Sequence, residues 1–209
     1  MSEEAMDVRT AADLMRQTQQ RTRNALEIRL APVYAAWGVA WLGGLGGMWL
    51  SVHGQQPYRD PSGLSAAALG VLNCLALTVT ITVVIRASRG VGGVTRWQGR
   101  MFGVAWLLGF GAVFAIDGAL ASHGASHAVQ GIAYATAPVV VTALIYLAGA
   151  AIWLETSMFV LGAWLAVVSV GAAWTGPVGA LAIGALAGGG GFLLAALLVL
   201  LRRREHDGS

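Results

Sequence analysis

Charge is scarce in this sequence, and lysine is missing from it altogether. Asp, Glu, Lys and Arg make up 11% of the 209 residues, and all 13 basic residues are arginine. Soluble globular proteins contain about 25% charged residues. A chain this poor in charge, with a mean hydropathy of +0.67, is typical of a membrane protein. The composition therefore argues against a soluble globular domain.

Cysteine occurs only once, as Cys74 in an apolar run. A lone cysteine excludes an internal disulfide framework and a cysteine-based metal site. The patterns of a P-loop, an HExxH zinc site, a GxSxG hydrolase and a paired-carboxylate site are also missing. We therefore expect no enzymatic activity and no cofactor. The arginines are dispersed and accompany no reading element, so we expect no nucleic-acid partner.

Long apolar segments, uncharged except for Asp117 near the end of the third, make up most of the chain. Six of them have about 20 residues, enough for a helix to cross a hydrocarbon core of about 30 Å. We predict an all-α integral membrane protein whose transmembrane domain covers residues 31–201. The expected spans are 31–52, 64–85, 101–121, 129–151, 156–175 and 177–201. Thr175-Gly176-Pro177 supplies the turn between the last two, because proline suits the first turn of a helix.

Polar segments flank this domain. Thr10 and Asp13 have the spacing of a capping box, which predicts a cytoplasmic or interfacial helix at about 11–30 within the polar segment 1–30. Both signs of charge precede the first apolar run, so we expect an uncleaved anchor rather than a signal peptide. Residues 202–209 form a basic tail.

Arginine is distributed unequally between the two sides of the predicted topology. Residues 1–30, a basic glycine-rich loop at 86–100 and the tail hold every arginine except Arg59. The positive-inside rule therefore places both termini in the cytoplasm, as in a multi-pass protein of a bacterial-type inner membrane. The same arginines are expected to contact anionic lipid headgroups.

One apolar phrase occurs three times. GVAWL at 38–42 returns unchanged at 103–107, and GAWL follows at 162–165. Each copy lies in the first helix of a predicted pair, which indicates three parallel two-helix repeats. The repeated tryptophans are either core residues or the wall of a ligand site. They are Trp41, Trp106 and Trp164.

Glycine is abundant, at 29 residues. Small residues four apart let membrane helices pack closely, as expected for Gly43 with Gly47 and for Gly184 with Gly188. Such packing acts within the monomer or between subunits, so we expect a homo-oligomer or a partner in a membrane complex.

Two further sets of residues are candidates for function. Hydroxyl and amide groups on spans two and four would form a continuous row of polar groups, which we call the polar file, if the helix faces that carry them meet. The alternative is that these groups form hydrogen bonds between helices, at about 0.6 kcal/mol per contact. On the predicted outer side, imidazole and carboxylate groups are suited to zinc or copper, or to sensing pH. The first set is Asn73, Thr80, Tyr134, Thr142 and Tyr146, and the second is Asp117, His53, His123 and His127. The strongest metal pair in the second set, His123 with His127, is weakened by Gly124 between them, and hydrated loop histidines are the alternative.

These patterns support one principal hypothesis and two alternatives. The principal one is a non-catalytic scaffold or accessory subunit of a membrane complex, such as a transport complex. The first alternative is a channel or facilitator for a small neutral solute along the polar file. The second is an extracytoplasmic metal or pH sensor that uses the outer histidines.

Overall fold

The computed structural model describes the backbone of residues 30–87 and 93–207 and the side chains of residues 30–87 and 96–201. Within these ranges there is no strand, and six helical segments are long and apolar enough to cross a membrane. The prediction of an all-α, six-span, multi-pass membrane protein is thereby confirmed. The helix predicted at 11–30 lies outside the described residues, apart from Leu30.

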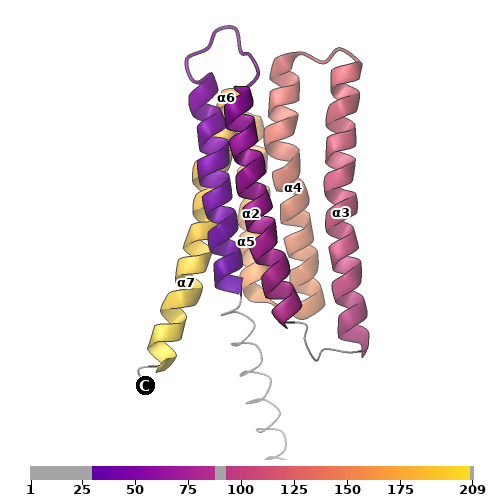
Figure 1. The fold of residues 1–209 in the computed structure, drawn as a ribbon, viewed down its shortest axis with the longest axis vertical. Helices are drawn as coiled ribbons and strands as arrows, with labels where there is room; N and C mark the ends of the chain where they lie inside the picture. Colours follow the sequence, from indigo (N-terminus) through magenta and orange to yellow (C-terminus); the bar gives the residue numbers. More distant parts are fainter. Residues whose placement is uncertain (1–29, 88–92, 208–209) are drawn as a thin grey trace, which may run out of the picture.

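The helices follow one another with short connections (Figure 1). They are a first span at Leu30–Val52, α2 at Gly63–Ala87, α3 at Gly93–Ser122, α4 at His127–Trp153, α5 at Thr156–Ala173, α6 at Gly176–Ile183, the π-helix η1 at Gly184–Gly189 and α7 at Gly190–Asp207. The sixth span consists of α6, η1 and the first part of α7, as far as Leu201. We call the end of the bundle that holds residues 53–62, 123–126 and 174–175 the outer end, after the predicted topology.

Polar residues and glycine set the boundaries of the helices at the predicted turns. The side chain of Ser126 accepts a hydrogen bond from the Val129 amide and caps α4. Glu155 caps α5 in the same way, accepting from the Ser157 amide at 3.3 Å, which places a carboxylate at the positive end of the helix dipole. Gly176 has a φ of +74°, a conformation that suits glycine, and it precedes Pro177 at the start of α6.

The prediction of a loop at 86–100 is wrong for most of that segment. The α2 helix continues to Ala87, and α3 begins at Gly93, several residues before the expected start of its span. Arginine is excluded from hydrocarbon, but it is a good helix former in water. The first turns of α3, which contain Arg96 and Arg100, are therefore helical outside the apolar part of the span.

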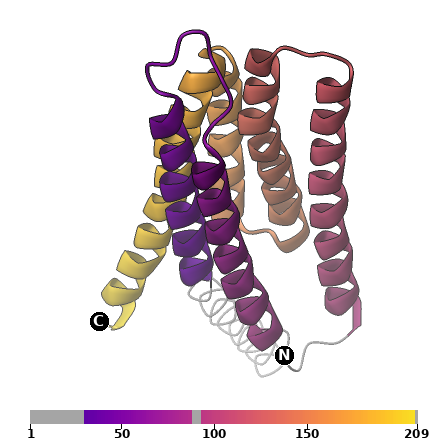
Figure 2. The same ribbon diagram turned by 45° about the horizontal axis from the view of Figure 1, so that its top comes forward.

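The core lies among the first span, α4, α5 and the sixth span. In the most apolar 18-residue stretch of α4, half of the residues are buried inside the protein, whereas the corresponding shares are 11% in α2 and 6% in α3. The latter two helices flank the bundle: α2 lies along the first span, and α3 packs on α4 (Figures 1 and 2). Most side chains of α2 and α3 therefore face away from the protein.

The predicted threefold repeat does not produce three equivalent environments. Trp41 is buried, Trp106 is half-buried, and 47% of Trp164 is exposed. The repeat accordingly remains a prediction from the sequence.

Candidate functional site

Three aromatic rings from the first span and α4 gather around Phe192, near the start of α7. The ring centroids of Trp41, Tyr146 and Tyr34 lie 5.2, 5.9 and 6.3 Å from that of Phe192. Trp106 extends the cluster, because its ring meets Tyr146 edge to face at 6.1 Å. Aromatic pairs of this kind contribute about 0.5–1.5 kcal/mol beyond the area they bury. Two of the repeated tryptophans thus belong to a packed core.

The third repeated tryptophan contacts η1. The Trp164 indole Nε1 donates a hydrogen bond to the Ala187 carbonyl at 2.9 Å, and the indole lies directly over Gly191. Trp41 approaches the same segment from the first span, since a Cβ added at Gly188 would lie 3.0 Å from its ring. Trp41 and Trp164 therefore both contact residues 187–192, whereas Trp106 reaches Phe192 only through Tyr146.

Glycines bring the sixth span into backbone contact with the first. A Cβ added at Gly189 would lie 2.7 Å from the Leu42 amide nitrogen and 3.1 Å from the Gly38 carbonyl oxygen. One turn earlier, Gly184 receives the side chain of Leu45, 3.1 Å from the position of its missing Cβ. Only glycine permits this approach of two backbones.

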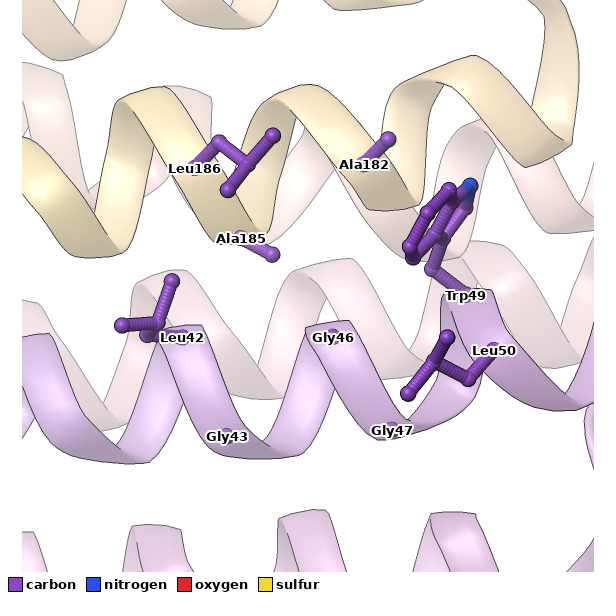
Figure 3. A pocket seen from close by; sticks show the side chains of 9 residues that line it. All are labelled: Leu42, Gly43, Gly46, Gly47, Trp49, Leu50, Ala182, Ala185 and Leu186. Atoms are coloured by element: carbon purple, nitrogen blue, oxygen red, sulfur yellow. The ribbon is translucent and has the colours of Figure 1, made fainter.

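Beside this contact, an open apolar groove of about 320 Å³ runs between the first span and the sixth (Figure 3). Its lining combines glycine and alanine with larger side chains at the margins. The small residues are Gly43, Gly46, Gly47, Ala182 and Ala185, and the larger ones are Leu42, Trp49, Leu50 and Leu186. Among the described residues, no atom lies within 4 Å of a Cβ added at Gly47. Both members of the predicted pair line this groove, and Gly47 faces its open space, whereas a Cβ at Gly43 would meet Leu72.

A second open groove of about 290 Å³ lies between the first span and α2. It is also apolar and is lined by residues such as Ala36, Val39, Leu72 and Leu75. Close packing between these two helices occurs elsewhere, where Gly44 contacts Leu69. The neighbouring Gly43 makes a looser contact, with Leu72 3.3 Å from an added Cβ.

The two halves of the predicted polar file do not face each other. No Cα atom of α2 lies within 8 Å of one in α4, because α2 follows the first span along the edge of the bundle. The Thr80 hydroxyl donates to the Ala76 carbonyl and accepts from Trp37 Nε1 at 3.0 Å. Thr142 donates to the Pro138 carbonyl at 2.8 Å. These hydroxyls form bonds within a helix or to its neighbour.

The remaining residues of the file lie in three different environments. Tyr146 is buried in the aromatic cluster, and 38% of Tyr134 is exposed near the outer end. Asn73 is half-buried on α2, and its Oδ1 accepts no hydrogen bond from the described residues. The five residues therefore do not line one continuous path within the described chain.

At the outer end, His127 pairs with Asp60 of the connection between the first span and α2. The His127 Nδ1 lies 3.0 Å from Asp60 Oδ2 and 3.1 Å from Oδ1, and both side chains are about two-thirds exposed. Tyr58 of the same connection packs on Gly131 of α4. Burial, and secondly the charge of Asp60, raise the pKa of Tyr58. The connection is thus held against the start of α4.

The other outer candidates are not brought to this pair. The His53 ring lies against Trp49, at 5.0 Å between centroids, and His123 bonds through Nδ1 to the Ala119 carbonyl at 2.8 Å. Within the described part of the chain, no three His, Cys, Asp or Glu side chains are grouped for a metal ion. Asp117 lies on the α4-facing side of α3, four residues after the buried Val113. Its carboxylate oxygens are covered and accept no hydrogen bond from described residues.

Comparison with known proteins assigns no relative. No protein-family model, no curated protein and no solved structure matches the chain.

Sequence reasoning missed the residues that make the closest contacts. Gly38, Gly44 and Gly189 approach neighbouring helices more closely than Gly43 and Gly47 do. All five lie in glycine-rich apolar segments, so their spacing carries no signal that separates them. The sequence placed Asp60 and His127 on the same outer face, but it did not single out their pairing, because they are 67 residues apart.

Proposed function

We propose that this multi-pass membrane protein is a non-catalytic scaffold or accessory subunit of a membrane complex, such as a transport complex. The groove lined by Gly43, Gly46 and Gly47 carries the proposal. In a bilayer, helices associate through close backbone packing, which small residues permit. Those glycines already lie on the surface of a folded bundle, where a partner helix can reach them.

The polar groups favour this function over solute passage. The two grooves described above are open and apolar, whereas a facilitator for a polar solute needs an enclosed path with groups that replace water. Thr80 and Thr142 bond within the protein, and α2 lies apart from α4. These observations support an assembly role for the membrane domain.

The test compares two glycines that differ only in position. The Cβ of Gly47→Leu enters the groove without contacting any described residue, and Gly111→Leu on exposed α3 is the matched control. We expect affinity purification from native membranes to recover an oligomer or partner with wild type and Gly111→Leu but not with Gly47→Leu. A wild-type protein that runs as a monomer and recovers no partner contradicts the proposal.

The location and orientation are part of the same proposal. We propose that the protein lies in a bacterial-type inner membrane with both termini on the cytoplasmic side. Segment 1–30 would then be available to a cytoplasmic partner, and the arginines would lie near anionic headgroups. Arg86 and Arg100 are exposed at the end opposite the outer connections, which supports this orientation. A C-terminal fusion to a reporter that works only outside the cytoplasm should be inactive, and activity of that fusion would contradict this orientation.

A second candidate function, pH sensing at the outer face, rests on the Asp60–His127 pair. A charged imidazole attracts a carboxylate at this distance, and histidine is the side chain that commonly serves as a pH sensor in proteins. An exposed pair contributes about 0–1 kcal/mol, enough to bias the connection 53–62. Under this proposal, protease accessibility of the connection falls on acidification in wild type. If His127→Asn shows the same pH response as wild type, pH sensing by this pair is ruled out.

A further inference from the structure

The groove between the first span and α2 has small side chains at its base and larger ones at its margins. Ala40 and Ala76 at the base are almost fully buried. At the margins, 54% of Val39 and 59% of Leu75 are exposed. The other lining residues are also apolar: Ala35, Ala36, Leu72 and Val79. In a bilayer, the groove therefore offers a hollow to an apolar chain.

Arg86 continues the groove-lining face of α2 beyond the end of the groove. Leu72 and Val79 line the groove, and Arg86 follows Val79 at the same spacing of seven residues. Seven residues fall about 20° short of two full helical turns, so the three residues lie along one face. Arg86 is exposed in the last turn of α2, at the end of the bundle opposite the outer connections (Figure 1). An exposed cation thus lies in line with an apolar groove.

The distance between Arg86 and the far end of the groove matches one leaflet of a bilayer. Leu72 precedes Arg86 by 14 residues, which is about 21 Å along a helix. A bilayer is about 40–45 Å thick with its headgroups, so one leaflet measures about 20–22 Å. A lipid whose headgroup lies at Arg86 therefore reaches Leu72 with an acyl chain.

The described charges favour a lipid over a second copy of the chain. Asp60 and Asp117 lie at or near the outer end, and Glu155 is buried at the start of α5. Among the described side chains, a second copy in the same orientation therefore offers no exposed acid at the level of Arg86. An anionic phospholipid carries its phosphate at that level and its acyl chain at the level of the groove.

We propose that this groove and Arg86 together bind one anionic phospholipid of the leaflet opposite the outer connections. The acyl chain lies on the alanines of the groove, and the phosphate accepts charge-assisted hydrogen bonds from the guanidinium. In the proposed orientation this is the cytoplasmic leaflet, whose surface is negative because of its anionic lipids. Binding itself depends neither on that orientation nor on the groove at Gly47.

The headgroup contact is tested by native mass spectrometry of the purified protein in detergent. The probes are phosphatidylglycerol and phosphatidylcholine with the same acyl chains, and the measurement is the ratio of their dissociation constants for the first bound lipid. An arginine near anionic headgroups contributes about fivefold to affinity. Arg86→Gln should therefore lower the preference for phosphatidylglycerol about fivefold, whereas Arg86→Lys should keep it. The matched control is Arg100→Gln, which removes an exposed arginine from α3 at the same end of the bundle and should also keep it.

The acyl-chain contact is tested by filling the groove. Ala36→Leu places a larger side chain in it and should weaken both lipids alike, by about fourfold for each methylene displaced. Ala115→Leu, exposed on α3, is the matched control and should bind both lipids as wild type does. SDS-induced unfolding checks that both variants fold, and Arg86→Gln decides the outcome if Ala36→Leu does not.

Three results would overturn the lipid site. They are an unchanged preference in Arg86→Gln, an equal loss of preference in Arg100→Gln, and binding of both lipids by a folded Ala36→Leu as tight as by Ala115→Leu. A wild-type dimer that Ala36→Leu dissociates would assign the groove to a second copy of the chain and would overturn it too.

Discussion

Replacing Gly189 by alanine tests the backbone contact between the first and sixth spans. The new methyl would lie 2.7 Å from the Leu42 amide nitrogen, where ordinary contact begins at 3.4 Å. Backbone atoms cannot turn aside as a side chain does, so the two helices must separate by about 0.7 Å. A gap of that size forfeits a quarter to a half of each affected van der Waals contact. The neighbouring contacts of Trp41 with Gly188 and of Leu45 with Gly184 weaken together.

The expected cost is about 1–3 kcal/mol of unfolding free energy, the usual range for an overpacked core. The measurement is SDS-induced unfolding in mixed micelles, followed by tryptophan fluorescence. Gly171→Ala is the matched control, because its Cβ would have no atom of a described residue within 4 Å and alanine stabilises a helix by up to about 1 kcal/mol over glycine. If Gly189→Ala unfolds at the same SDS fraction as Gly171→Ala, the inferred backbone contact is absent.

Three other outcomes follow from the described contacts. The raised pKa of Tyr58 stabilises the fold below the ordinary tyrosine value of about 10, and this contribution is lost as pH rises through the folded pKa. Thermal unfolding between pH 8 and 11 should therefore be less pH-dependent in Tyr58→Phe than in wild type. The Trp37–Thr80 bond should show a coupling of about 0.6 kcal/mol in a double-mutant cycle with Trp37→Phe and Thr80→Val; zero coupling contradicts it. Neutral-solute flux into liposomes should be the same for wild type and for the double variant Asn73→Leu with Thr142→Val. A loss of flux in the variant would instead support solute passage along the polar file.

Much of the fold was predictable because the bilayer restricts the choices. An uncharged segment of about 20 residues has few alternatives to a spanning helix. The turns at Ser126, Glu155 and Gly176 were marked by residues with local capping or turn preferences. Charge located the ends of the apolar spans, but it did not locate the ends of the helices. For that reason α3 begins earlier than expected, at Gly93.

The candidate site was less predictable because periodicity identifies the face of a helix without naming its neighbour. Thr80 faces Trp37 of the first span rather than α4. The π-turn gave no signal either, since the run Gly188–Gly191 is compatible with both registers. Gly47 and Gly189 have similar sequence surroundings, yet one lines an open groove and the other touches a backbone.

Site-specific photo-crosslinking in native membranes tests the assembly role most directly. A photoreactive residue at Leu50, which is 68% exposed at the margin of the groove, is compared with one at Leu107, which is 76% exposed on α3. We predict a discrete protein adduct from position 50, abolished by Gly47→Leu, and only lipid adducts from position 107. Lipid adducts alone at both positions would contradict a partner helix in the groove and with it the proposed scaffold function.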